Sequence, residues 1–76
     1  MSQVLFLKLS MNLVLNGEKR NVPNIDTVSE LLEKLNLAAG MVVVEQNGQV
    51  VQRAHFPVAK LAEGDKIEIV RVVAGG

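Results

Sequence analysis

The 76-residue sequence predicts an α+β domain, in which one main helix packs on one face of a mixed sheet of four to five strands. Two Asn-Gly pairs, Asn16-Gly17 and Asn47-Gly48, each separate two strand-like segments, and Asn-Gly is the preferred pair for a tight β-hairpin turn. A single helical apolar stripe lies between the two hairpins, over residues 28–35. Because this stripe has no second helix to pack on, we expect it to cover the sheet.

The N-terminal half is predicted to form the first hairpin and the helix. Residues 11–15 alternate between apolar and polar, which indicates a half-buried strand. Residues 18–22 would be the returning strand, whose ladder ends at Pro23. Thr27 and Glu30 match a capping box at the start of a helix. Apolar residues then recur at helical spacing: Val28, Leu31, Leu32 and Leu35.

The C-terminal half is predicted to add three strands, so the element order becomes β-β-α-β-β-β. The β-branched run 41–45 and the segment 49–52 flank the second Asn-Gly turn. Residues 53–61 have no clear period and indicate a loop or a short helical turn, and the last strand runs from Lys66 to about Val73. The predicted core consists of Leu13, Leu15, Val28, Leu31, Leu32, Leu35, Ile67 and Ile69.

The chain ends with Ala74-Gly75-Gly76, directly after the last predicted strand. Since glycine has no Cβ, we expect a thin, flexible tail that can enter a narrow channel of a partner. Its carboxylate is ionised at neutral pH, and a partner enzyme could activate it. The alternative is a frayed end, because two consecutive glycines arise by chance about once in 200 positions.

The last strand also suggests a surface for partner contact. If Ile67 and Ile69 face the helix, alternation places Val70 and Val72 on the opposite face of the sheet. Two apolar side chains beside a reactive tail favour a docking patch, although single exposed valines are common in small proteins. Arg71, between them, is a further candidate for partner contact.

Composition excludes several classes of function. Eight basic and eight acidic residues cancel, and the only aromatic residues are two phenylalanines, which argues against nucleic-acid binding. Without cysteine the chain has no disulfide and no thiolate chemistry of its own, and we expect a cytoplasmic location. The apolar run 4–7 is too short for a signal peptide or a membrane span.

No side-chain cluster indicates a catalytic or metal site. His55 is the only histidine, and we expect a plain surface residue in a loop. Glu63 and Asp65 could suggest a cation site, but acids in a turn are more simply solvated. We therefore expect no catalytic residue, no metal and no bound cofactor.

The chain contains a set of short segments in a characteristic order and spacing. The segments are Leu13-Val14-Leu15-Asn16-Gly17, Thr27-Val28, Leu31-Leu32, Val42-Val43-Val44, Arg53, Leu61, Gly64-Asp65, Ile67-Glu68-Ile69-Val70 and Val73-Ala74-Gly75-Gly76. This set resembles the ThiS family of bacterial thiamine-pathway sulfur carriers, which has the ubiquitin-like β-grasp fold. The resemblance covers residues 11–76.

The resemblance implies a sulfur carrier that is not itself an enzyme. An E1-like adenylating enzyme would use ATP and magnesium to form an acyl-adenylate on Gly76, with Gly75 and Ala74 providing access. Sulfur from a persulfide enzyme would then displace AMP. The resulting thiocarboxylate would pass sulfur to a thiazole synthase.

Three alternatives remain open at this point. The small subunit of molybdopterin synthase is also a β-grasp carrier, but that family often has proline and an aromatic residue where this chain has Arg71-Val72-Val73. A ubiquitin-like protein modifier would join Gly76 to a lysine as an isopeptide. A small interaction domain would use the tail for no chemistry.

The first ten residues depart from the family pattern, in which the first strand begins at the initiator methionine. Met11 occupies that place here, so we divide the chain into an N-terminal extension (1–10), a β-grasp domain (11–73) and a carrier tail (74–76). An unbroken strand from Gln3 to Leu15 would span roughly 40 Å, too long for this domain to cover. The overhang would then fold back, fray, or pair with another molecule through its exposed edge. The alternative is that the extension is an upstream segment without a role.

Overall fold

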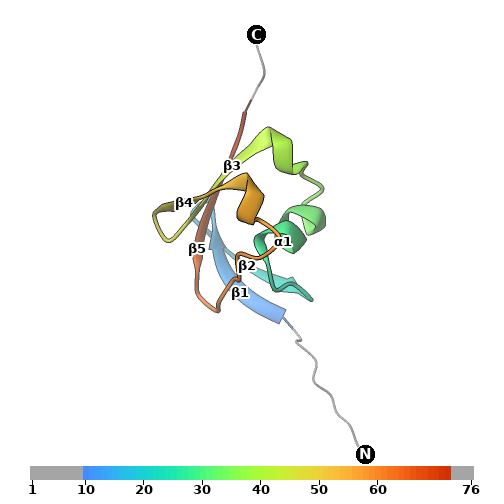
Figure 1. Ribbon diagram of the computed structural model, residues 1–76. Coiled ribbons are helices and arrows are strands. Elements are labelled where there is room, and N and C mark those ends of the chain that lie inside the picture. Colours follow the sequence, from blue (N-terminus) through green and yellow to red (C-terminus); the bar gives the residue numbers. More distant parts are fainter. Residues whose placement is uncertain (1–9, 73–76) are drawn as a thin grey trace, which may run out of the picture.

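The computed structural model describes residues 10–72, and it shows a five-stranded mixed sheet with one α-helix (Figure 1). The strand order is β2-β1-β5-β3-β4. The elements are β1 (Ser10–Leu15), β2 (Glu18–Pro23), α1 (Val28–Lys34), β3 (Val42–Gln46), β4 (Gln49–Val51) and β5 (Lys66–Arg71), with 3₁₀ turns η1 (Ala39–Met41) and η2 (Arg53–His55). The predicted fold class and element order are confirmed. The predictions for residues 1–9 and for the tail fall outside the described residues.

Both Asn-Gly pairs form the predicted hairpin turns. Asn16 and Gly17 have φ angles of 50° and 84°, and Asn47 and Gly48 have φ angles of 52° and 86°. Two consecutive positive φ angles define a type I′ turn, whose twist matches that of the flanking strands. The ladder of β2 ends at Pro23, as predicted, and Pro23 is the last residue of the strand. A proline is tolerated there because β2 lies at the edge of the sheet.

The helix begins with the predicted capping box. The Thr27 hydroxyl accepts a hydrogen bond from the Glu30 backbone N–H at 3.3 Å, and the Glu30 carboxylate accepts one from the Thr27 N–H at 3.2 Å. The helix ends at Lys34, so Leu35 is the C-cap residue. Leu35 is half-buried at the margin of the core, because it lies just beyond the last helical turn.

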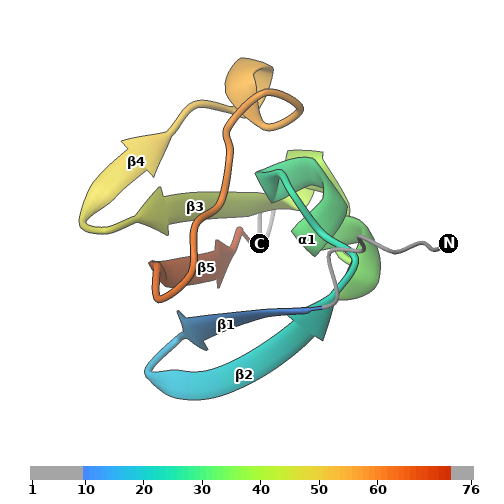
Figure 2. The same cartoon turned by 90° about the horizontal axis from the view of Figure 1, so that it is seen from below.

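The first and last strands of the described chain pair in parallel at the centre of the sheet. Val14 N donates to Asp65 O at 2.9 Å, and Asn16 N donates to Ile67 O at 2.8 Å. In Figure 2 the strands follow one another from β4 to β2, with α1 against one face. The lone helix therefore covers the mixed sheet, as its single apolar stripe predicts.

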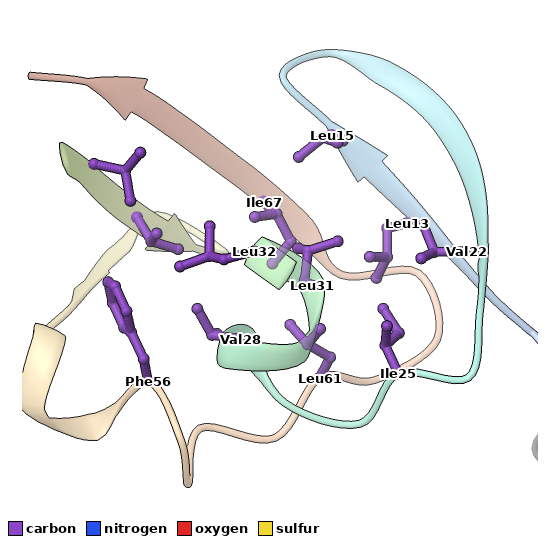
Figure 3. Packing of buried hydrophobic residues seen from close by; sticks show 12 residues of the cluster. Leu13, Leu15, Val22, Ile25, Val28, Leu31, Leu32, Phe56, Leu61 and Ile67 are labelled. Carbon is purple, nitrogen blue, oxygen red and sulfur yellow. The ribbon is translucent and has the colours of Figure 1, made fainter. Parts of the chain in front are cut away.

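The core lies between this face of the sheet and the helix (Figure 3). Six of the eight predicted core residues are buried, whereas Leu35 and Ile69 are half-buried and pack against the core. The sequence analysis missed six further buried residues: Val22, Ile25, Val42, Val44, Phe56 and Leu61. Phe56 and Leu61 come from the aperiodic segment 53–61, where no local pattern indicates which side chains point inward.

Leu32→Ala should lower the free energy of unfolding by about 2–5 kcal/mol, because it leaves a cavity in the core of a small domain. Leu32 is 2% exposed. The matched control is Val58→Ala, since Val58 is 68% exposed and should change stability by less than about 0.5 kcal/mol. Urea denaturation followed by circular dichroism measures both values. Equal losses for the two variants would contradict the described packing.

Candidate functional site

Strand β5 leads into the Gly-Gly tail, and its two faces differ. Ile67 is buried and Ile69 is half-buried beneath α1. Val70 and Val72 are 59% and 48% exposed, on the opposite face of the sheet. The predicted alternation is therefore confirmed, and Val72 lies at the end of the strand from which the chain continues to Gly76.

Two valines from neighbouring strands extend this apolar surface. Val43 on β3 lies directly opposite Val70, and directly opposed side chains on one face of an antiparallel pair are in contact range. Val50 on β4 lies opposite Glu45, two residues from Val43 along the same face. We name these four exposed residues the valine patch: Val43, Val50, Val70 and Val72.

Sequence analysis missed Val43 and Val50, although a signal was present. The run 42–44 is entirely β-branched, and its alternation puts Val42 and Val44 in the core and Val43 outside. Apolar residues on both faces of a strand indicate that its outer face is not simply solvated. Farther from the tail the same outer face becomes charged, with Glu45 directly opposite Glu68.

Arg71 does not belong to the valine patch. It lines an open groove on the other side of β5, between the end of β1 and the end of the helix, together with Leu15, Asn16, Leu35, Leu37 and Ile69. The three residues predicted for partner contact thus lie on two different faces of the sheet. Alternation along β5 places Arg71 on the same face as Ile67 and Ile69, whereas Val70 and Val72 lie on the outer face.

We had expected Glu63 and Asp65 to be simply solvated. Instead, both are structural acids, which accept hydrogen bonds from other parts of the fold. The Glu63 carboxylate accepts hydrogen bonds from the Asn12 backbone N–H at 3.0 Å and from the Asn12 side-chain amide at 2.7 Å. These bonds, the backbone bond first, lower the pKa of Glu63 below its usual value. The Glu63 side chain therefore bonds to the backbone of β1 next to the segment where β1 pairs with β5.

Asp65 is 9% exposed and joins the second hairpin to the start of β5. Its carboxylate accepts hydrogen bonds from Gln46 Nε2 at 2.7 Å, Asn47 Nδ2 at 2.9 Å and Ala62 N at 2.9 Å. Burial raises the pKa of Asp65, but the hydrogen bonds from Asn47, Gln46 and Ala62 outweigh it and the pKa is lowered. The acid thus fixes the position of the strand that leads to the tail.

Residues 10–72 form no metal-binding cluster. His55 is exposed in η2, as predicted. Within the same residues, no group of three histidine, cysteine or acidic side chains could hold a metal ion. The described chain also contains no helix that is long and apolar enough to cross a membrane.

Comparison with known proteins assigns the family. The ThiS family model matches residues 8–76, which include the whole described fold and the Gly-Gly end. The chain belongs to the ThiS family. This family consists of small sulfur carriers of thiamine biosynthesis, which agrees with the thiamine branch predicted from the sequence.

Solved structures of the family have the same fold. The crystal structure of the thiamine biosynthesis protein ThiS from Geobacter metallireducens is 38% identical, with a TM-score of 0.74 over 87% of this chain and 100% of that one. The NMR solution structure of a thiamine biosynthesis protein from the same organism is also 38% identical, with a TM-score of 0.72 over 87% of this chain and 88% of that one. The predicted β-grasp fold is confirmed.

A longer relative contains a segment similar to this chain. A thiazole synthase from Paramagnetospirillum magneticum is 39% identical over 66 residues, which make up 87% of this chain and 20% of that protein. The chain therefore spans about a fifth of the length of this relative. The uncharacterized protein ycf40 of Trieres chinensis is 27% identical over 62 residues, 82% of this chain and 85% of that protein.

The Asp65 carboxylate should make folding stability depend on pH. Because its pKa is lowered from 3.8 in the folded state, the ionised form stabilises the fold above about pH 3.8, and this contribution is lost as the pH falls through the lower folded-state value. Asp65→Asn replaces one of the two accepting oxygens with an N–H₂ group, which then faces one or two of these three donors. The variant should therefore cost about 1–3 kcal/mol at pH 7. The variant should lose less stability than the unsubstituted chain between pH 5 and pH 2.

Urea denaturation at several pH values between 2 and 7 measures this difference. Glu63→Gln is the matched control, because Glu63 is also a hydrogen-bonded acid of the same turn but is exposed. Its effect should be the smaller one. If Asp65→Asn and the unsubstituted chain had the same pH dependence, Asp65 would not be held ionised by these bonds.

Proposed function

We propose that this protein carries sulfur as a thiocarboxylate on Gly76 for thiazole formation in thiamine biosynthesis. It acts as a protein co-substrate of its partner enzymes and contributes no catalytic side chain. The observation that carries this proposal is the family match, which extends through the last residue of the chain. The reactive group is thus the main-chain carboxylate, for which no cysteine is needed.

The proposed cycle overcomes the low reactivity of a carboxylate. A carboxylate is a poor acyl donor because oxide is a poor leaving group. An E1-like adenylating enzyme, with ATP and magnesium bound to it, would join a Gly76 carboxylate oxygen to the α-phosphorus and release pyrophosphate. The acyl-adenylate that forms has AMP as a good leaving group.

Sulfur enters when a persulfide of a donor enzyme attacks the carbonyl carbon of the adenylate and AMP leaves. A second thiol then cleaves the sulfur–sulfur bond, which leaves the thiocarboxylate on Gly76 and a disulfide on the donor side. The thiocarboxylate is a stronger nucleophile than the carboxylate. Thiazole synthase would be the acceptor of this sulfur, and the similarity of the chain to a segment of a thiazole synthase supports this partner.

An exposed apolar surface beside the end of β5, from which the chain continues to Gly76, supports the proposed cycle. Strand β5 lies between β1 and β3, and β3 pairs with it as far as Arg71. The valine patch lies on the outer face at the end of β5 from which the chain continues to the carboxylate. Apolar contacts that exclude water are the usual centre of a protein interface, and we assign the valine patch this role for the adenylating enzyme.

Blocking the Gly76 carboxylate as an amide should abolish thiocarboxylate formation and leave the fold intact. The amide has no oxygen anion to attack ATP, and the change does not touch the core. Intact-protein mass spectrometry detects the mass gain from replacement of oxygen by sulfur, after incubation with ATP, the adenylating enzyme of the same genome and a persulfide donor. Deletion of Gly76 should have the same result.

The same incubation separates the other classes of function. Conjugates on target lysines would indicate a protein modifier instead of a carrier. If the unblocked chain stayed unmodified, the remaining class would be a small interaction domain whose tail does no chemistry. Sulfur acceptance by the amidated protein would contradict the mechanism.

Val70→Asp should raise the KM of the adenylating enzyme for this protein about tenfold, because it places a charge in the apolar centre of the proposed interface. Val58→Asp is the matched control, since Val58 is equally apolar and is 68% exposed outside the sheet. Initial rates of adenylate formation at varied carrier concentration give KM and kcat for both variants. Equal KM values would exclude the valine patch as the docking surface.

A further inference from the structure

Strand β5 has an open pairing edge next to the tail. On one side β5 pairs with β3 as far as the Val72 N–H, which donates to Met41 O at 2.8 Å. On the other side β1 ends at Leu15, opposite Ile67. The last four residues of β5 therefore extend beyond the end of β1.

The direction of each backbone group on β5 follows from these bonds. Val72 donates to β3, whereas the Ile67 carbonyl accepts from β1 through Asn16 N. Neighbouring residues of a strand point their N–H and C=O groups to opposite sides. The N–H and C=O of Arg71 thus point toward the side where β1 has ended, and within residues 10–72 no hydrogen bond satisfies the Arg71 N–H.

A side-chain amide already occupies the first open position of this edge. Asn16 Oδ1 accepts from the Ile69 N–H at 2.8 Å, and Asn16 Nδ2 donates to the Ile69 carbonyl at 3.2 Å. A carboxamide has the same donor and acceptor groups as a peptide unit. The edge therefore binds a peptide-like group at Ile69, and the next pair of groups, on Arg71, lies about 7 Å farther along the strand.

The groove beside this edge defines the chemistry of an occupant. Four of its lining residues, Leu15, Leu35, Leu37 and Ile69, are apolar, and Arg71 is the only charged one. An apolar floor accommodates alternate side chains of an added strand, and a guanidinium pairs best with a carboxylate. These features favour an extended segment with apolar residues and an acidic one.

We propose that an extended acidic segment of a partner protein adds to β5 at Arg71 and lies in this groove. Its backbone would accept from the Arg71 N–H and donate to the Arg71 carbonyl, next to the Asn16 amide. The identity of the partner rests on the proposed function, which names the adenylating enzyme and the thiazole synthase. Because the edge precedes the terminal carboxylate by only five residues, such a strand guides the tail into the partner's channel. This site is separate from the valine patch, which lies on the outer face.

Amide hydrogen exchange of the ¹⁵N-labelled full chain tests the proposal directly. In the free protein the Val72 amide, bonded to β3, should exchange slowly and the Arg71 amide quickly. In complex with the adenylating enzyme or the thiazole synthase of the same genome, the Arg71 amide should slow at least about tenfold. A stable complex with each enzyme in which the Arg71 rate is unchanged would overturn the proposal.

Substitutions at Arg71 separate the backbone contribution from the side chain. Arg71→Ala and Arg71→Pro both remove the guanidinium, but only the proline removes the N–H, and that N–H makes no bond to β3. The KM for adenylation or for sulfur transfer should be about tenfold higher for the proline variant than for the alanine variant, with kcat unchanged. Equal KM values in both reactions would overturn the proposal.

Three further outcomes are interpreted as follows. If the proline variant does not fold, the exchange experiment on the unsubstituted chain decides alone. If the unsubstituted chain forms a thiocarboxylate but Arg71 is unprotected in both complexes, the strand-addition proposal fails and the proposed function stands. If it binds neither enzyme and acquires no sulfur, both fail.

Discussion

The parallel pairing of β1 with β5 is the interaction on which the rest of the structure depends. It joins residues as far apart as Asn16 and Ile69, 53 positions apart in sequence. Closing such a long loop costs more conformational entropy than closing a local turn. The backbone pairing has only two register pairs, Val14 with Lys66 and Leu15 with Ile67. Without it the two hairpins would share no sheet, and α1 would have no continuous face to cover.

Polar side chains lengthen this short pairing at both ends. The Glu63 carboxylate binds the Asn12 N–H at one end, and the Asn16 carboxamide binds both backbone groups of Ile69 at the other. Asp65 then ties the start of β5 to the second hairpin. A 76-residue domain buries only a modest apolar area, so these hydrogen bonds contribute appreciably to the position of β5.

Strand β5 has three distinct surfaces in this structure. One face completes the core with Ile67, the outer face carries Val70 and Val72 in the valine patch, and the free edge presents the backbone of Arg71. Under the proposed function the reactive group is the main-chain carboxylate of Gly76, and no catalytic side chain is needed. In the proposed function the fold would present the end of β5 to partner enzymes through its outer face and its free edge.

The sequence by itself determined the local elements of this protein. The two Asn-Gly turns, the Thr27 capping box and the alternation along β5 each depend on residues close in the chain, so their physical causes can be recognised without the fold. For the same reason the exposure of Val70 and Val72 was predictable. The family resemblance rested on these segments and on the Gly-Gly end.

Only the tertiary structure decided which distant groups meet. The burial of Phe56 and Leu61, the hydrogen bonds that turn Glu63 and Asp65 into structural acids, and the groove beside Arg71 all join segments that no local period connects. Every residue except proline has the same backbone donor and acceptor, so sequence does not label which strand edge remains open. That edge depends on where β1 ends relative to β5, and long-range packing of the whole domain sets this register.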